Sequence, residues 1–136
     1  MFYKSEKEII EVVRGFENGT IAEKDWRHNE HLVVACYYAF HHDLETSIGK
    51  MRSGIFNLLN AFKVDLSKEM PFHETLTVFW MRTVFDLVKT RDGVSFVETT
   101  NRVLETCGDK DLPLRFYSRE RLFSDEARKR FVEGDL

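Results

Sequence analysis

The fold is decided by residues 25–43, DWRHNEHLVVACYYAFHHD. With 3.6 residues per helical turn, apolar side chains fall on two opposite sides of this segment. One side carries Trp26, Val33, Tyr37 and Phe40, and the other carries His28, His31, Leu32, Ala35, Cys36, Ala39 and His42. The strip that remains for solvent holds Arg27, Glu30, Val34 and His41. A helix that is apolar on two sides packs inside a bundle, so we expect residues 25–43 to form its central helix.

Helical patterns also mark the segments on either side. Ser5 and Glu8 form a capping-box pattern at the start of a first helix. Apolar periodicity predicts helices over residues 6–18, 47–62, 71–89 and 95–107, short helical pieces around 114–123, and a final helix to about 132. No segment alternates apolar and polar residues as a strand does. The sequence therefore predicts an all-α, single-domain bundle of about five to six helices.

The composition is that of a globular domain, with 43% hydrophobic and 32% charged residues in 136. The net charge of -3 gives no basic surface, so we expect no nucleic-acid partner. No apolar run is long enough to span a bilayer and the N-terminal stretch has no signal-peptide core, so we expect no membrane association. Cys36 and Cys107 form no C-x-x-C pair, which is typical of reduced thiols. These features predict a soluble, cytoplasmic protein.

Three histidines at core positions are the main functional clue. His28 and His31 are three residues apart, so their rings can converge from one helical face. His73 lies on the apolar stripe of the helix predicted over 71–89. Three imidazoles are a typical ligand set for zinc or another late first-row divalent metal. A metal bound by His28, His31 and His73 is therefore one hypothesis for the bundle interior.

Three further residues complete the predicted pocket. Glu74 follows His73 but points about a quarter-turn away from it, and Thr77 lies one turn further along the same helix. Tyr117 lies in a segment that alternates cations with aromatic residues. Together with the three histidines, these residues predict an interior pocket for a small molecule or a metal ion, with histidine acid–base chemistry as an enzymatic version.

Two other interpretations stay open at this point. The protein could be a non-enzymatic interaction or regulatory module, or a homo-oligomer, that uses an aromatic-rich surface; it would then expose an apolar patch. Alternatively, the histidines serve only the fold, with their ring nitrogens bonded to backbone carbonyls or a carboxylate.

Four motifs carry a resemblance. They are Trp26-x-His28-x-x-His31-Leu32, Met51-Arg52-x-Gly54-Ile55, His73-Glu74-Thr75-Leu76-Thr77 and Tyr117-Ser118-x-x-x-Leu122-x-Ser124-x-x-Ala127-Arg128. From about Trp26 to the C-terminus, the chain resembles a family of small, uncharacterised bacterial helical proteins, which implies a shared site without naming its chemistry. A looser likeness is to DinB-type helical bundles, which hold a metal with three histidines. Those bundles place a histidine pair on the last helix, whereas no histidine follows His73 here.

Overall fold

The computed structural model describes residues 2–91 and 93–136. Its helices are α1 (Glu6–Glu17), η1 (Glu23–Asp25), α2 (His28–His41), α3 (Leu44–Ala61), α4 (Glu74–Lys89), α5 (Phe96–Thr106), η2 (Leu112–Arg115), α6 (Arg119–Leu122) and α7 (Asp125–Lys129). The described residues contain no strand, so the predicted all-α class is confirmed. There are more helices than expected, because the C-terminal part divides into very short ones. None of the helices in the described ranges is both long and apolar enough to cross a membrane.

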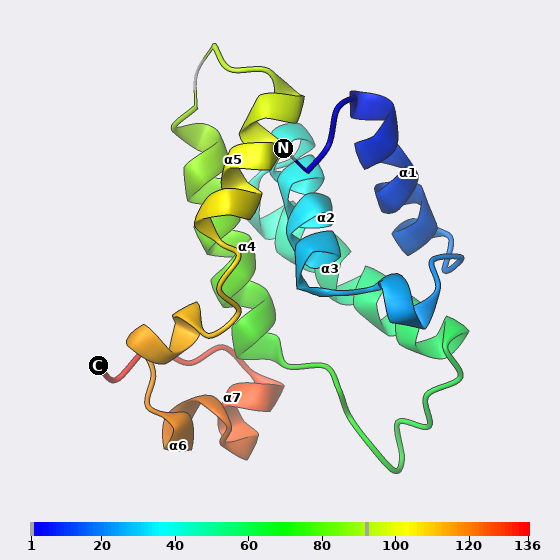
Figure 1. Cartoon of the computed structure of the whole chain (residues 1–136). Coiled ribbons are helices and arrows are strands. Elements are labelled where there is room, and N and C mark those ends of the chain that lie inside the picture. The colour runs from blue at the N-terminus through cyan, green and yellow to red at the C-terminus, as the bar shows by residue number, and fades with distance from the viewer. Residues whose placement is uncertain (1, 92) are drawn as a thin grey trace.

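Helix α2 is the central helix, and α1, α3, α4 and α5 all contact it (Figure 1). Four helices surround α2, so the prediction of a solvent-exposed strip on this helix is wrong at two positions. Val34 is 0% exposed and Glu30 is 8% exposed. The remaining core residues of α2 are Leu32, Val33, Ala35, Cys36, Tyr38 and Ala39. The prediction of a central helix therefore holds, and α2 is buried on more sides than its sequence pattern indicated.

Helix α2 begins at His28 rather than at residue 25. The backbone of Arg27 is extended, with φ −117° and ψ −177°, and its N–H donates to a carboxylate oxygen of Glu30 at 3.0 Å. This bond satisfies a backbone donor at the helix start. Trp26 consequently precedes the helix, so the helical repeat does not determine which way its side chain points.

Helix α4 begins at Glu74, three residues later than expected. His73 is its N-cap residue, with an extended backbone (φ −135°, ψ 107°). The Nδ1 atom of His73 accepts a hydrogen bond from the backbone N–H of Leu76 at 3.2 Å. The prediction that His73 lies on the stripe of a helix starting at Pro71 is therefore wrong, because the helix starts only after this side-chain cap.

Helices α1 and α3 follow ordinary capping rules. Ser5 and Glu8 form the predicted capping box of α1, and Gly19 adopts φ +68° just after the helix ends. Helix α3 begins earlier than predicted because the Asp43 carboxylate accepts a hydrogen bond from the Thr46 N–H at 2.7 Å. These caps fix where α1 and α3 begin.

The C-terminal segment, residues 112–136, folds against the first half of α4 (Figure 1). Its own core consists of Tyr117, Leu122, Ala127 and Val132, which pack with Leu76, Phe79 and Leu114. The hydroxyl of Thr75 donates to the Arg130 carbonyl at 3.0 Å and accepts from the Val132 N–H at 3.2 Å. The segment thereby anchors the start of α4, which forms one wall of the pocket described next.

Candidate functional site

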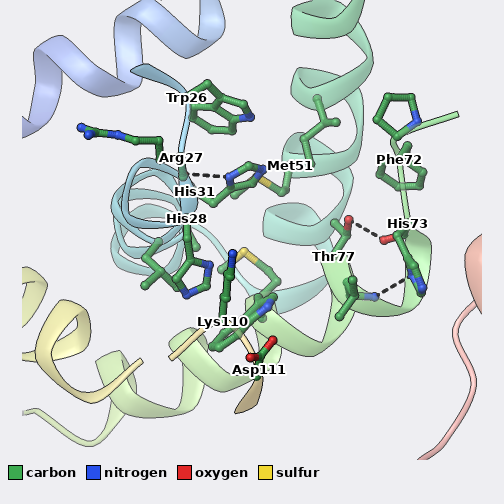
Figure 2. A pocket seen from close by; sticks show the side chains of 17 residues that line it. Trp26, Arg27, His28, His31, Met51, Phe72, His73, Thr77, Lys110 and Asp111 are labelled. Atoms are coloured by element: carbon green, nitrogen blue, oxygen red, sulfur yellow. Dashed lines mark hydrogen bonds between the residues drawn. The ribbon is translucent and has the colours of Figure 1, made fainter. Parts of the chain in front are cut away.

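A pocket of about 420 Å³ lies between α2, α3, α4 and the loop before η2 (Figure 2). Most of its lining is apolar, and aromatic rings and methionines are prominent in it. The lining residues are Trp26, Arg27, His28, His31, Leu32, Ala35, Met51, Ile55, Pro71, Phe72, His73, Leu76, Thr77, Trp80, Met81, Lys110 and Asp111. A concave apolar surface with a few polar groups is the usual form of a small-molecule site.

His31 supplies the most informative polar atom of the pocket. Its Nδ1 lies 3.1 Å from the carbonyl oxygen of Arg27, one turn earlier. A carbonyl oxygen only accepts hydrogen bonds, so Nδ1 carries the proton and Nε2 keeps a lone pair. Among the described residues, Nε2 has no hydrogen-bond partner. The imidazole therefore offers one acceptor to the pocket.

The surroundings of His31 keep this ring neutral. Its centroid lies 4.1 Å from that of Trp26, and the ring lies between Trp26 and Met51 (Figure 2). Burial lowers the pKa of His31 to about 4, with a smaller contribution in the same direction from His28. At neutral pH, His31 is thus an uncharged acceptor.

This lowered pKa predicts a loss of stability in acid. Between its unfolded pKa of about 6.5 and its folded pKa of about 4, the unfolded chain binds the proton that native His31 does not. The free energy of unfolding should therefore fall as pH falls, by about 3 kcal/mol from this group between pH 7 and pH 4. The measurement is urea unfolding across that range for the wild type and for His31→Phe, which cannot titrate. A stability difference between the two proteins that does not change with pH would contradict the prediction.

His28 holds a second position on the same wall. Its Nε2 lies 2.8 Å from the carbonyl oxygen of Cys107, so Nε2 carries the proton and donates. The ring meets Trp80 edge-on, with centroids 4.7 Å apart. His28 therefore joins the first turn of α2 to the end of α5, and in its neutral form its Nδ1 is an acceptor.

His73 lies across the pocket from His28 and His31 (Figure 2). Both nitrogens of its ring form hydrogen bonds to the backbone. Besides the bond from Leu76 to Nδ1, its Nε2 donates to the carbonyl oxygen of Leu122 at 2.7 Å. Burial and the charge of Arg128 lower the pKa of His73 and favour its neutral form, which this pair of bonds requires. Both ring nitrogens are occupied, so His73 has no free lone pair for a ligand.

The three-histidine metal hypothesis is not supported by this arrangement. The described residues contain no group of three or more His, Cys, Asp and Glu side chains placed to hold a metal ion. The physical reason lies in His73, whose Nδ1 lone pair caps α4 while its Nε2 proton binds the C-terminal segment. His28 and His31 share a pocket wall, as their spacing indicated, but the third ligand is missing.

Glu74 does not belong to the pocket. Its carboxylate pairs with Arg52 of α3, which donates through Nε at 2.9 Å to one oxygen and through Nη2 at 2.5 Å to the other. This forked geometry is the strong form of an Arg–carboxylate pair. Glu74 therefore ties α3 to the first turn of α4 and holds two walls of the pocket together.

Of the two hydroxyl residues predicted in the pocket, Thr77 lines it and Tyr117 does not. Thr77 lines the pocket, but its hydroxyl donates to the His73 carbonyl at 2.9 Å, one turn earlier. Tyr117 is buried in the C-terminal segment, where its hydroxyl donates to the Val132 carbonyl at 2.5 Å. The expectation that Tyr117 enters the pocket is wrong, because its ring packs in the core of the C-terminal segment and it is not among the lining residues.

The sequence pattern does not predict the place of three polar or aromatic groups around the pocket. Trp26 was expected on the side of the central helix opposite to the histidines, but it precedes α2 and its ring contacts that of His31 at a tilt of 40°. Lys110 and Asp111 lie in a loop, where no periodicity predicts position. The packing of α5 against α2 brings this loop to the pocket. A local sequence pattern therefore does not mark it as part of a site.

The chain has no match among protein-family models, curated proteins or solved structures. The resemblance to the small bacterial helical family and the looser likeness to DinB-type bundles therefore stay predictions.

Proposed function

We propose that the pocket between α2, α3 and α4 binds a small, largely apolar aromatic molecule that carries an N–H or O–H donor. The observation that carries this proposal is the lone pair of His31 Nε2, held neutral in a pocket of about 420 Å³ with no partner from the described residues. A polar atom in such surroundings gains most from a ligand that donates to it, because water competes poorly in an apolar pocket.

The aromatic character of the ligand is inferred from the walls. Trp26, Phe72 and Trp80 present rings, and Met51 and Met81 present thioethers. Ring–ring contacts and sulfur–ring contacts both stabilise an aromatic body beyond its buried area. A strongly polar ligand would lose its hydration without compensation along these walls.

The same chemistry favours binding over histidine catalysis. A general base works best when its pKa is near the operating pH, and His31 is held at about 4. It therefore acts as a hydrogen-bond acceptor rather than as an efficient proton acceptor. We accordingly propose a binding protein, with the enzymatic interpretation set aside for this pocket.

Calorimetric titration with two matched indoles tests the proposal. 3-Methylindole carries the ring N–H and 1,3-dimethylindole lacks it, while both have the same aromatic body. We expect 3-methylindole to bind the wild type with a Kd on the order of 0.1–1 mM. We expect 1,3-dimethylindole to bind roughly five- to tenfold more weakly, the usual effect of one lost hydrogen bond.

The variant His31→Phe completes the comparison, since it keeps a ring beside Trp26 but removes the lone pair. In this variant the two indoles should bind equally, both near the affinity of 1,3-dimethylindole for the wild type. Equal affinities in the wild type, or no binding of 3-methylindole at millimolar concentration, would overturn the proposal. Circular dichroism of the variant shows whether the helical fold is retained.

A further inference from the structure

Two adjacent residues of opposite charge stand at one edge of the pocket. Lys110 and Asp111 lie in the loop between α5 and η2, and both line the pocket. Figure 2 shows them below His28, with the Lys110 side chain extending toward the pocket. Both residues are exposed, so they border the opening while the histidines and tryptophans lie further in.

Within the described part of the chain, neither charged group forms a salt bridge or a side-chain hydrogen bond. The salt bridges there include neither residue, and the Asp111 carboxylate accepts no hydrogen bond. Arg27, the other cation of the lining, differs because it pairs with Glu30 at 3.3 Å. The edge of the pocket thus presents one uncommitted cation and one uncommitted carboxylate, side by side.

The two charges disfavour ligands that carry a charge of only one sign. A ligand with only a carboxylate is attracted by Lys110 and repelled by Asp111, and a ligand with only an ammonium group meets the reverse. A head group that carries both charges satisfies both residues at once. Deeper in the pocket, His31 offers an acceptor and the walls offer aromatic surface.

We propose that the ligand is an aromatic α-amino acid. Its carboxylate binds Lys110, its ammonium group binds Asp111, and its ring enters the pocket with a donor directed to His31 Nε2. Tryptophan and tyrosine have this combination of head group, ring and donor. This inference rests on the proposed function, and it adds the head group to the aromatic body proposed there.

Calorimetric titration of the full chain with four probes of one ring system tests the inference. L-Tryptophan carries both charges, tryptamine only the ammonium group, indole-3-propionate only the carboxylate, and 3-methylindole neither. We expect L-tryptophan to bind at least about fivefold more tightly than each of the other three, as two solvated charge pairs allow.

Two charge-removing variants assign the contacts. In Lys110→Gln, L-tryptophan should fall to the affinity of tryptamine, and indole-3-propionate should weaken several-fold. In Asp111→Asn, L-tryptophan should fall to the affinity of indole-3-propionate, and tryptamine should weaken. Lys129→Gln, on exposed α7 and outside the pocket lining, is the matched control and should change none of the affinities.

The outcomes separate this inference from the proposed function. If 3-methylindole binds through His31 but L-tryptophan binds no more tightly than 3-methylindole, the amino-acid inference is overturned and the apolar pocket stands. The same holds if L-tryptophan keeps its higher affinity in both Lys110→Gln and Asp111→Asn. If 3-methylindole itself does not bind, the proposed function is overturned and the inference with it. If each variant weakens the probes as expected, the result supports both the proposed function and the amino-acid inference.

Discussion

Replacing Gly54 with alanine should destabilise the protein by about 1–3 kcal/mol, the usual cost of overpacking a core. A Cβ added at Gly54 of α3 would lie 2.3 Å from two carbons of the Phe16 ring. Phe16 is fully buried, and its ring stacks on Trp26 with centroids 4.8 Å apart, so a shift of the ring would disturb the packing of the core. The close approach of α1 and α3 therefore requires glycine at this position.

Gly49 provides the matched control within the same helix. A Cβ at Gly49 would meet no atom within 4 Å, so Gly49→Ala adds helix propensity without a clash. It should stabilise the protein by about 0.5–1 kcal/mol. Urea unfolding of the two variants and the wild type measures both effects. A Gly54→Ala protein as stable as Gly49→Ala would show that the contact with Phe16 is not tight.

The second large effect is expected at His73. In His73→Ala, the Leu76 N–H loses its cap and the Leu122 carbonyl loses its donor. A lost cap costs about 1 kcal/mol and a buried group left without its partner costs about 1–3 kcal/mol. The free energy of unfolding should therefore fall by about 3 kcal/mol.

His73→Asn separates the two roles of this residue. Asparagine is a good N-cap, so its side-chain oxygen can replace Nδ1, but it is too short to reach the Leu122 carbonyl. It should recover about 1 kcal/mol relative to His73→Ala, the usual contribution of an N-cap. Urea unfolding gives the stabilities, and hydrogen exchange of the Leu76 amide reports on the cap directly. If the alanine and asparagine variants are equally unstable and exchange Leu76 equally fast, His73 does not cap α4.

Much of the fold could be predicted because it depends on local signals. The Ser5–Glu8 capping box, the end of the first helix near residue 18 and the doubly apolar pattern of residues 25–43 each predicted what the structure contains. The placement of His28 and His31 on one wall of a pocket also followed from their spacing along one helix.

The rest of the site depends on contacts between distant parts of the chain. Histidine is not among the usual N-cap residues, and Pro71 suggested an earlier helix start, so the sequence pattern did not predict the capping role of His73. The bond from His73 to Leu122 joins residues 49 apart in sequence, and no periodicity announces it. The same holds for Lys110 and Asp111, which reach the pocket only because α5 packs on α2.

The bonds that hold the C-terminal segment to α4 have a consequence for how this sequence can vary. The side chains of His73 and Thr75 bind main-chain atoms of Leu122, Arg130 and Val132. Any residue supplies a carbonyl oxygen, and any residue except proline supplies an N–H, so exposed positions of the segment can change residue type while its backbone path is kept. His73 and Thr75 cannot drift in the same way. We therefore expect a mutational scan to tolerate exposed positions between 119 and 131 broadly, and to reject most substitutions at 73 and 75.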